Sequence, residues 1–573
     1  MVDDIQRGIQ DIIYSLEEGR VARFLRTVLL CGFIVGIVGI YGYTQFRGLR
    51  DAAAMDYAQV GRELARGSGF RTSCIRPAQL GHLEKIGLAA NLDGAQPDLV
   101  HAPVYPAALA LGFRIAKPSF TAERGRLFAP ERLVVVPVGQ LFTIATCLVV
   151  LTLGRLLFNR AVALVSALAY VLSHAVLAES ISGFPTPLSC FLSTSAFAAG
   201  VAAIRALASR QSPRAHWGFI VLTAVCTVLG ALTDYSLVLL VALLCGMFYF
   251  AIEDPGSRAG VTLVFLLLCI VGLAPWAFRN LATGGGPLGL AHLAVLQDTR
   301  LFEGEQAWRS LAPAFDQARI FKALELKLWS NTALLLDGEL WQIGGVMFMA
   351  FFTVSFLYRF VRDEVHVLRW IILVGIVLFS AWVALHGLQH ARLLMIFSPF
   401  VVLYGVAFFF RVLDILDIMI APLRASLAVV VVGISALPLI LTLLSSRPQI
   451  PYPPYYPPLV QQVTQLLEED EVVCSDIPEA TAWYGDRVSV LLPGTLEEFY
   501  KIHGFVHRIS GLYLTSRTSD RPFMRDLVTG RERDWLPILN RQIPEDFPLE
   551  HGIALPRGSS DQLFLTDRVR WQE

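Results

Sequence analysis

The chain has 573 residues, of which 55% are hydrophobic and 16% charged, and its mean hydropathy is +0.56. Soluble domains carry about 25% charged residues, so this composition excludes an ordinary soluble enzyme and predicts a polytopic α-helical membrane protein. The formal net charge is zero, which argues against a nucleic-acid partner.

The N-terminus combines an amphipathic segment with a longer apolar one. Residues 1–22 place apolar side chains at three- and four-residue steps from Val2 to Leu16, which predicts a cytoplasmic amphipathic helix. The apolar run of residues 24–46 is too long for a cleaved signal peptide, and no small-residue cleavage site follows it. We therefore expect a signal anchor.

A polar stretch, Asp51 to Pro106, follows this first apolar run. Residues 52–66 have the helical period, with one apolar stripe and an opposite stripe that includes Asp56 and Glu63. Gly67 supplies a helix stop. The pattern predicts a helix along the membrane surface with a carboxylate facing away from the lipid. Residues 104–116 are apolar but too short to span, so we expect a re-entrant or interfacial helix there.

Further apolar runs bring the predicted number of membrane spans to about eleven, since a span needs about 20 residues. They lie near residues 24–46, 132–153, 161–178, 187–204, 217–233, 235–252, 260–278, 342–358, 370–386, 393–410 and 425–445. Arginines fill the alternate short loops that include Arg155, Arg205, Arg258 and Arg411, whereas the other short loops carry Arg392 alone. This asymmetry predicts a cytoplasmic N-terminus.

The same orientation puts three polar segments outside. These are loops 47–131 and 279–341 of a transmembrane domain covering residues 23–446, and the tail beyond it. Residues 447–458 form a proline-rich, stiff linker. Residues 459–573 then predict a small extracytoplasmic α/β domain that folds by itself. Its expected strands are 472–475, 488–492, 511–515, 553–555 and 563–565, and its expected helices are 478–484 and 496–502.

The cysteines and the search for metal-binding motifs give few candidate functional residues. Six of the eight cysteines lie in apolar runs, and only Cys74 and Cys474 lie in polar segments. A disulfide between these two stays an open alternative, because pairing depends on a close approach that spacing does not reveal. The sequence contains no HExxH motif or DxD run, so we expect no cofactor, with a divalent metal left open as the alternative.

Several ionisable side chains fall at the outer ends of the predicted spans. They are His174, Glu179, Asp234, Arg279, His386, His390 and Arg392. Charged groups near a membrane are costly and usually face a cavity or a partner. The competing interpretation is that they are helix ends reaching into water, and for Glu63 it is a solvated helix face.

The order of these pieces resembles the C-type, multi-spanning membrane glycosyltransferases, in particular the family 39-like group. That group includes protein O-mannosyltransferases and lipid A aminoarabinose transferases. The resemblance covers nearly the whole chain and rests on a first span, an acid-bearing outer helix and a proline-rich segment in that order. The matching segments are residues 56–70, 101–106, 274–280, 390–399 and 476–487.

The resemblance implies transfer of a sugar from a polyprenyl-phosphate-linked donor to a hydroxyl of a lipid, glycan or protein acceptor. It implies a bacterial inner-membrane protein with its site and tail on the periplasmic side, and Asp56 as the acid that activates the acceptor. It also matches His101 to a phosphate-binding position. The tail would bind an acceptor or a partner protein, or cover the site.

The residues support the same chemistry independently, because a sugar phosphoester needs a base for the acceptor and cations for the leaving phosphate. Arg279 and Arg392 suit the phosphate. Glu63, Glu179, Asp234 and His390 are secondary or acceptor candidates.

Two other classes stay open. The first is a transporter or flippase, against which we find no paired halves with matching broken helices. The second is a non-catalytic scaffold with the glycosyltransferase fold, because Met55 stands where the family often carries a second acid.

Overall fold

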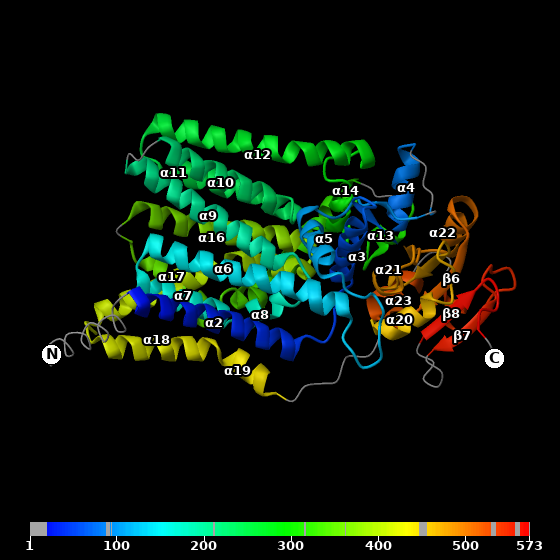
Figure 1. Ribbon diagram of the computed structural model, residues 1–573. Coiled ribbons are helices and arrows are strands. Elements are labelled where there is room, and N and C mark those ends of the chain that lie inside the picture. The colour runs from blue at the N-terminus through cyan, green and yellow to red at the C-terminus, as the bar shows by residue number, and fades with distance from the viewer. Residues whose placement is uncertain are drawn as a thin grey trace.

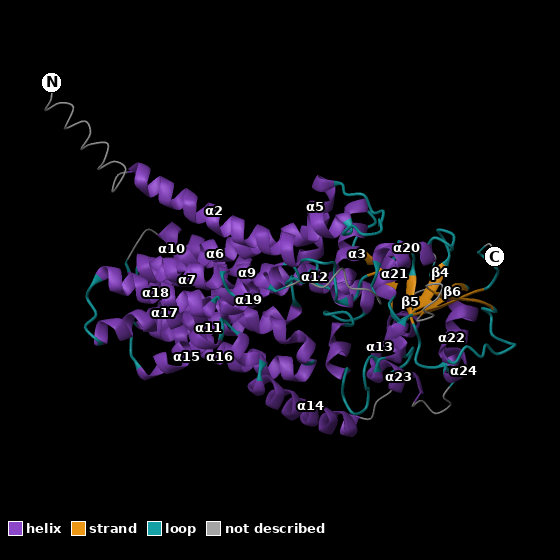
Figure 2. Cartoon of the chain, turned by 90° about the horizontal axis from the view of Figure 1, so that it is seen from below, coloured by secondary structure: helices purple, strands orange, loops and turns teal. Residues whose placement is uncertain are grey.

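The protein consists of a long helical bundle with a smaller α/β domain at one end (Figure 1). The computed structural model describes residues 20–87, 92, 94–209, 213–313, 317–360, 362–445, 455–528, 534–555 and 562–571. Most of the predicted amphipathic segment 1–22 and of the linker 447–458 lies outside these residues. Figure 2 shows that the strands gather beyond one end of the bundle, which we call the domain end.

Apolar helices coincide with all eleven predicted spans, but at most nine of them within the described residues are long enough to cross a membrane. Among the described residues, seven helices are long and apolar enough to cross a membrane, and two further pairs qualify if each bent pair counts as one span. The two remaining predictions, 235–252 and 342–358, fall on shorter apolar helices. The bundle helices are α2 (Arg20–Gln45), α6 (Val136–Leu157), α7 (Arg160–Val171), α8 (His174–Ser180), α9 (Thr186–Ala208), α10 (Pro213–Ala231), α11 (Leu239–Ala251), α12 (Pro255–Gly284), α15 (Val346–Val354), α16 (Asp363–His386), α17 (Ser398–Ile415), α18 (Ala421–Ser435) and α19 (Leu437–Leu444).

Five helices from the two long loops lie at the domain end (Figure 1). They are α3 (Ala52–Arg66), α4 (Pro77–Lys85), α5 (Val104–Ala116), α13 (Gln306–Arg309) and α14 (Gln317–Asp337). The predicted helix 52–66 is confirmed, and it ends at Gly67, whose φ of 88° is left-handed and suits glycine. α5 packs directly on α3, where a Cβ on Gly61 would meet the Leu109 side chain at 2.9 Å.

The tail forms a mixed sheet of six strands within the described residues, in the order β2-β5-β4-β6-β8-β7. Every strand and helix predicted for the tail is present. The strands are β4 (Val472–Ser475), β5 (Ser489–Leu491), β6 (Ile509–Leu514), β7 (His551–Leu555) and β8 (Gln562–Thr566), and the helices are α20 (Pro457–Thr464), α21 (Pro478–Gly485), α22 (Leu496–Lys501), α23 (Arg521–Val528) and α24 (Leu536–Leu539).

One strand of this sheet comes from far outside the tail. β2 (Cys74–Ile75) belongs to the first long loop and pairs in parallel with β5. A second, two-stranded sheet in that loop pairs β1 (Arg71–Thr72) with β3 (Gln96–Pro97). A domain boundary at residue 459 therefore leaves one edge strand of the tail sheet outside the domain.

The sheet also decides the open question about the two polar-segment cysteines. Cys74 lies in β2 and Cys474 in β4, with β5 between them, and both thiols are buried and free in the described structure. Strands two places apart are separated by about 10 Å, which exceeds the reach of a disulfide. The alternative of a disulfide is therefore wrong.

A buried carboxylate fastens the tail to the bundle. Glu131 lies just before α6 and accepts hydrogen bonds from Trp483 Nε1 at 3.0 Å, Tyr484 Oη at 2.7 Å and the backbone of Leu49 at 3.2 Å. These contacts join the end of the first bundle helix, the start of another and α21, so the tail is held close over α3.

Candidate active site

The polar side of α3 is turned into the protein. Asp56 is 0% exposed and Glu63 is 7% exposed. α21 lies over this side, where the buried Arg62 guanidinium donates to the backbone carbonyls of Ala482 and Trp483 at 3.0 and 2.9 Å. The interpretation of Glu63 as part of a solvated face is therefore wrong, because tail and loop groups replace the water that this face would otherwise bind.

Three side chains hold the carboxylate of Asp56, the predicted general base. Nη2 of Arg76 lies 2.6 Å from Oδ2, and Nε2 of Gln59 donates to Oδ1 at 3.0 Å. Nε2 of His101 lies 3.5 Å from Oδ2. Gln59 is one turn along α3, whereas Arg76 follows β2 directly. The candidate base is thus enclosed and paired with a cation.

His101 bridges two carboxylates. Its Nδ1 lies 2.7 Å from Oδ2 of Asp98, whose Oδ1 accepts from the backbone of Val100 and His101. Burial alone would raise the pKa of Asp98, but the charge and hydrogen bonds of His101 outweigh it and hold that pKa at about 2. Burial lowers the pKa of His101, and the charges of Asp98 and Asp56 more than reverse this. The imidazole predicted to bind phosphate is instead engaged between Asp98 and Asp56.

A second layer of charge comes from the tail and the second long loop. Glu479 at the start of α21 places Oε1 3.9 Å from Nη2 of Arg76. Arg517, which follows β6, pairs with Glu305 and donates to the hydroxyl of Tyr455 at 3.0 Å. Loop one, loop two and the tail therefore each contribute charged groups around Asp56.

The donors of Arg279, a predicted phosphate ligand, point into the protein. Its Nη1 donates to the carbonyl of Asp98 at 2.7 Å and to Oδ1 of Asn280 at 3.0 Å, and its Nη2 donates to the carbonyl of Phe70 at 3.2 Å. The rings of Phe70 and Trp276 flank the guanidinium. In this arrangement Arg279 ties α12 to the loop that carries Asp98.

Arg392, the other predicted phosphate ligand, belongs to a separate group. Its Nη2 lies 3.6 Å from Oδ2 of Asp51, its guanidinium stacks on Phe184, and its side chain is 25% exposed. The charges of Arg392 and Asp51 both act on Glu179, which also accepts from Ser182 Oγ at 3.4 Å. Asp51 directly precedes α3, but its side chain makes no capping hydrogen bond in the described structure and pairs with Arg392 instead.

Asp234 and His390 form a third group. Asp234 caps the helical turn before α11 by accepting from the backbone of Ser236 at 2.9 Å. Its charge acts on His390 and on Tyr57. Burial, then Asp234 and Asp56, raise the pKa of Tyr57, and this ring also packs edge-on against His101 at 4.5 Å. Tyr57 therefore lies between Asp234 and the Asp56 cluster, by which we mean Asp56 with Gln59, Arg76 and His101.

Four charged residues of this site were not predicted from the sequence: Arg76, Asp98, Glu479 and Arg517. Asp98 lies three residues before His101, and that spacing was a usable signal. Arg76 and Arg517 gave none, because each follows a strand whose neighbours are distant in the sequence.

The described residues do not fit a metal ion at this site. No group of three His, Cys, Asp or Glu side chains in the described part of the chain is arranged to hold one. The position nearest to Asp56 and Glu479 is taken by the guanidinium of Arg76.

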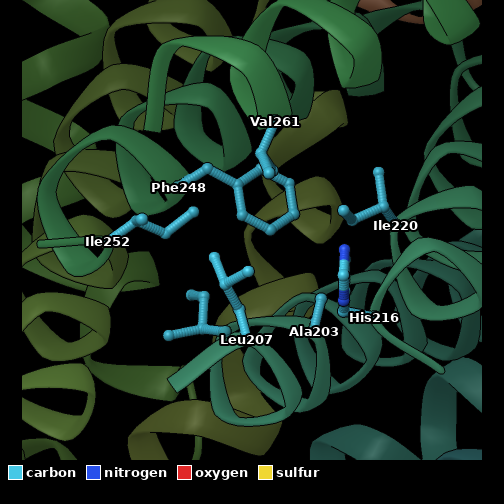
Figure 3. Close-up of a pocket in the computed structure, with 8 residues that line it drawn as sticks. Ala203, Leu207, His216, Ile220, Phe248, Ile252 and Val261 are labelled. Atoms are coloured by element: carbon cyan, nitrogen blue, oxygen red, sulfur yellow. The ribbon is translucent and has the colours of Figure 1, made fainter. Parts of the chain in front are cut away.

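A small apolar pocket lies at the opposite end of the bundle. Figure 3 shows side chains from α9, α10, α11 and α12 around it, among them Leu207, His216, Phe248 and Val261. These positions are at the end of α9 and α11 and the start of α10 and α12, away from the charged clusters. The pocket therefore does not belong to the candidate active site.

Comparison with solved structures gives the fold a known counterpart. The apo form of the Archaeoglobus fulgidus oligosaccharyltransferase is 12% identical, with 88% of this chain and 71% of that chain covered and a TM-score of 0.59. This chain shares the fold of an oligosaccharyltransferase. The complex of the same enzyme with zinc and sulfate gives 13% identity, 88% and 70% coverage and a TM-score of 0.57. AglB from that organism, with an inhibitory peptide and a dolichol-phosphate, gives 12% identity, 88% and 72% coverage and 0.57.

These identities show the fold alone. ArnT from Cupriavidus metallidurans, in its apo state, covers 96% of this chain and 98% of its own at 10% identity, but the TM-score of 0.40 is too low to carry an argument. No protein-family model matches the sequence, and no curated protein matches it. The expected polytopic helical fold with a small C-terminal sheet is therefore confirmed, and the C-type and narrower family 39 groupings stay predictions.

Proposed function

We propose that this protein is a membrane glycosyltransferase that moves a sugar from a polyprenyl-phosphate-linked donor to a hydroxyl group, with Asp56 as the general base. The observation that carries the proposal is the Asp56 cluster itself. A buried carboxylate at the domain end of the bundle lies within 3.5 Å of a histidine that a second carboxylate, Asp98, orients. This arrangement can take a proton from an acceptor and stabilise the charge that results.

The roles of the two arginines follow from how fully protein partners occupy their guanidinium groups. The phosphate of the donor is already a good leaving group, so the protein has to bind it and deprotonate the acceptor. Arg392 is the better phosphate ligand, because its main partner, Asp51, is a half-exposed carboxylate 3.6 Å away. Arg279 is assigned a positioning role, since three protein oxygens already accept from it.

The solved counterpart supports the donor class. The complex of AglB with a dolichol-phosphate and an inhibitory peptide favours a polyprenyl-phosphate ligand for this chain and is compatible with a protein acceptor. Lipid and glycan acceptors remain part of the proposal. The arginine asymmetry between the loops favours a site on the outer face of the membrane, and the family resemblance favours a bacterial inner membrane with this face on the periplasmic side.

The test is sugar transfer by the purified protein in lipid nanodiscs, with labelled polyprenyl-phosphate sugars and a membrane extract as acceptor. Asp56→Asn keeps size and most hydrogen bonding but removes the base, so transfer should fall by about 10² to 10⁴. Glu123→Gln is the control, because it removes an exposed carboxylate of the same long loop that pairs with Arg126, and it should cost far less. Near-normal turnover by Asp56→Asn at matched donor binding would assign the base elsewhere.

The second candidate is the non-catalytic scaffold, and one observation favours it. Asp56 has no exposed surface and is paired with Arg76 at 2.6 Å. If the wild-type protein binds polyprenyl phosphate but transfers no sugar from any of the labelled polyprenyl-phosphate sugars, the protein is a non-catalytic scaffold.

A further inference from the structure

The tail sheet presents its carboxyl edge to α3. In open α/β sheets, ligands and functional groups collect beyond the carboxyl ends of parallel strands, at the point where successive connections diverge. Here β4 has β5 on one side and β6 on the other, and all three are parallel. Three charged side chains follow strand ends at this edge: Arg76 after β2, Glu479 after β4 and Arg517 after β6.

Arg76 lies between two carboxylates that compete for one atom. Its Nη2 is 2.6 Å from Oδ2 of Asp56 and 3.9 Å from Oε1 of Glu479. A displacement of about 1 Å would bring the second contact into hydrogen-bond range and weaken the first. The guanidinium also lies over the ring of Trp308, 5.4 Å from its centroid. The guanidinium can slide across the flat Trp308 ring more readily than it could move if hydrogen bonds surrounded it on all sides.

Glu479 is incompletely partnered. The residue is 8% exposed, and within the described structure its Oε2 is buried without a hydrogen-bond partner. The charged and titratable groups that face it are Arg517, Arg76, Glu305, Asp56 and Tyr455. Burial raises the pKa of Glu479 to about 7 against the opposing charges of Arg517 and Arg76. Its ionisation near neutral pH therefore changes the attraction that Arg76 feels.

We propose that Glu479 is a positioning residue of the tail that draws Arg76 away from Asp56 and so frees Asp56 to act as the base. The proposal rests on the proposed function for its catalytic consequence, but not for the shift of Arg76 itself. When Glu479 is protonated, Arg76 stays on Asp56 and the base is blocked. When Glu479 is ionised, Arg76 moves to it, and His101 and Gln59 remain as the partners of Asp56.

The first arm of the test measures the pH dependence of sugar transfer. The wild-type rate should fall about tenfold per pH unit below the pKa of Glu479, because the ionised fraction falls by that factor. Glu479→Gln should be slow at every pH and lose this dependence, whereas Glu479→Asp should restore it in part. Glu498→Gln is the control for tail contacts, since Glu498 accepts from Ser310 and Leu311 in the second loop. It should keep the wild-type profile.

The second arm needs no turnover. Infrared difference spectra of the full protein in nanodiscs, recorded as a function of pH, should contain a carboxyl band that Glu479→Gln removes. A band that Asp56→Asn removes should change with the same midpoint. Coupled bands with no sugar transfer would support the shift of Arg76 and reject the proposed function. Independent bands, or an unchanged pH profile in Glu479→Gln, would overturn the inference while leaving the transferase proposal standing.

Discussion

Replacing Arg309 should loosen the second long loop from the tail domain. Arg309 and Asp526 have fully buried side chains, and Nη1 of Arg309 lies 2.7 Å from Oδ2 of Asp526. Arg309 also donates to the carbonyls of Leu492 and Pro493, at 2.7 and 2.9 Å. Burial lowers the pKa of Arg309 and raises the pKa of Asp526 to about 6. Both directions indicate that desolvation of the pair outweighs its attraction.

The size of the effect follows from the burial. Removing one partner of a buried ion pair costs about 3–5 kcal/mol, because it leaves the other charge uncompensated. In Arg309→Ala, local opening should therefore become about two to three and a half orders of magnitude more favourable. Hydrogen exchange of the α23 backbone amides, measured on the full protein in detergent, reports this opening directly.

The double variant Arg309→Met with Asp526→Leu separates packing from charge. It replaces the pair with apolar side chains, which in other proteins is neutral or stabilising by about 1–4 kcal/mol. Its α23 amides should therefore exchange as slowly as in the wild type, or more slowly. Equal exchange in the single and double variants, or no change in Arg309→Ala, would refute the reasoning.

Three further outcomes are expected. Arg392→Ala should raise the apparent donor KM more than Arg392→Lys does. Arg279→Ala should instead lower the melting midpoint without a specific effect on the donor KM. An unchanged donor KM in Arg392→Ala would contradict the assignment of Arg392 as a phosphate ligand. Asp476 and Glu479 have pKa values raised by burial to about 6 and about 7, so the folded tail holds more protons than the unfolded chain from about pH 4 to 7. Tail stability should fall as pH rises through that window, and a midpoint rising with pH would contradict this sign. A reporter enzyme that works only outside the cytoplasm should be active when fused after Glu573, and activity of a cytoplasm-only reporter there would refute the orientation.

Local patterns were sufficient to predict the helices and most strands. Apolar run length located the spans, and Gly67 marked the end of α3, because both signals act over a few neighbouring residues. β2 was not predicted, because two residues are too short to show an alternating pattern and their partner strand lies in the tail. A sheet contact of this kind has no local signature.

The candidate site was predicted in part, for a similar reason. Asp56 was predicted as the base and His101 as a phosphate ligand, and their side chains lie 3.5 Å apart, with His101 engaged by carboxylates. Their actual partners, Arg76 and Asp98, were not identified. From the sequence, the polar stripe of α3 could face either water or another part of the protein. Only the position of α21 over this stripe decides that it faces protein.

The pairing of β2 with β5 sets a waiting time during synthesis. Ile75 must pair beside Val490, 415 residues later in the chain (490 minus 75). At about 5–20 residues per second, the first long loop is present for roughly 20 to 80 s before its partner strand has been made. During that interval β2 has no neighbour from the tail, and Arg76, which follows it, lacks its contact with Glu479. The charged cluster around Asp56 is therefore completed only when synthesis reaches the last fifth of the chain.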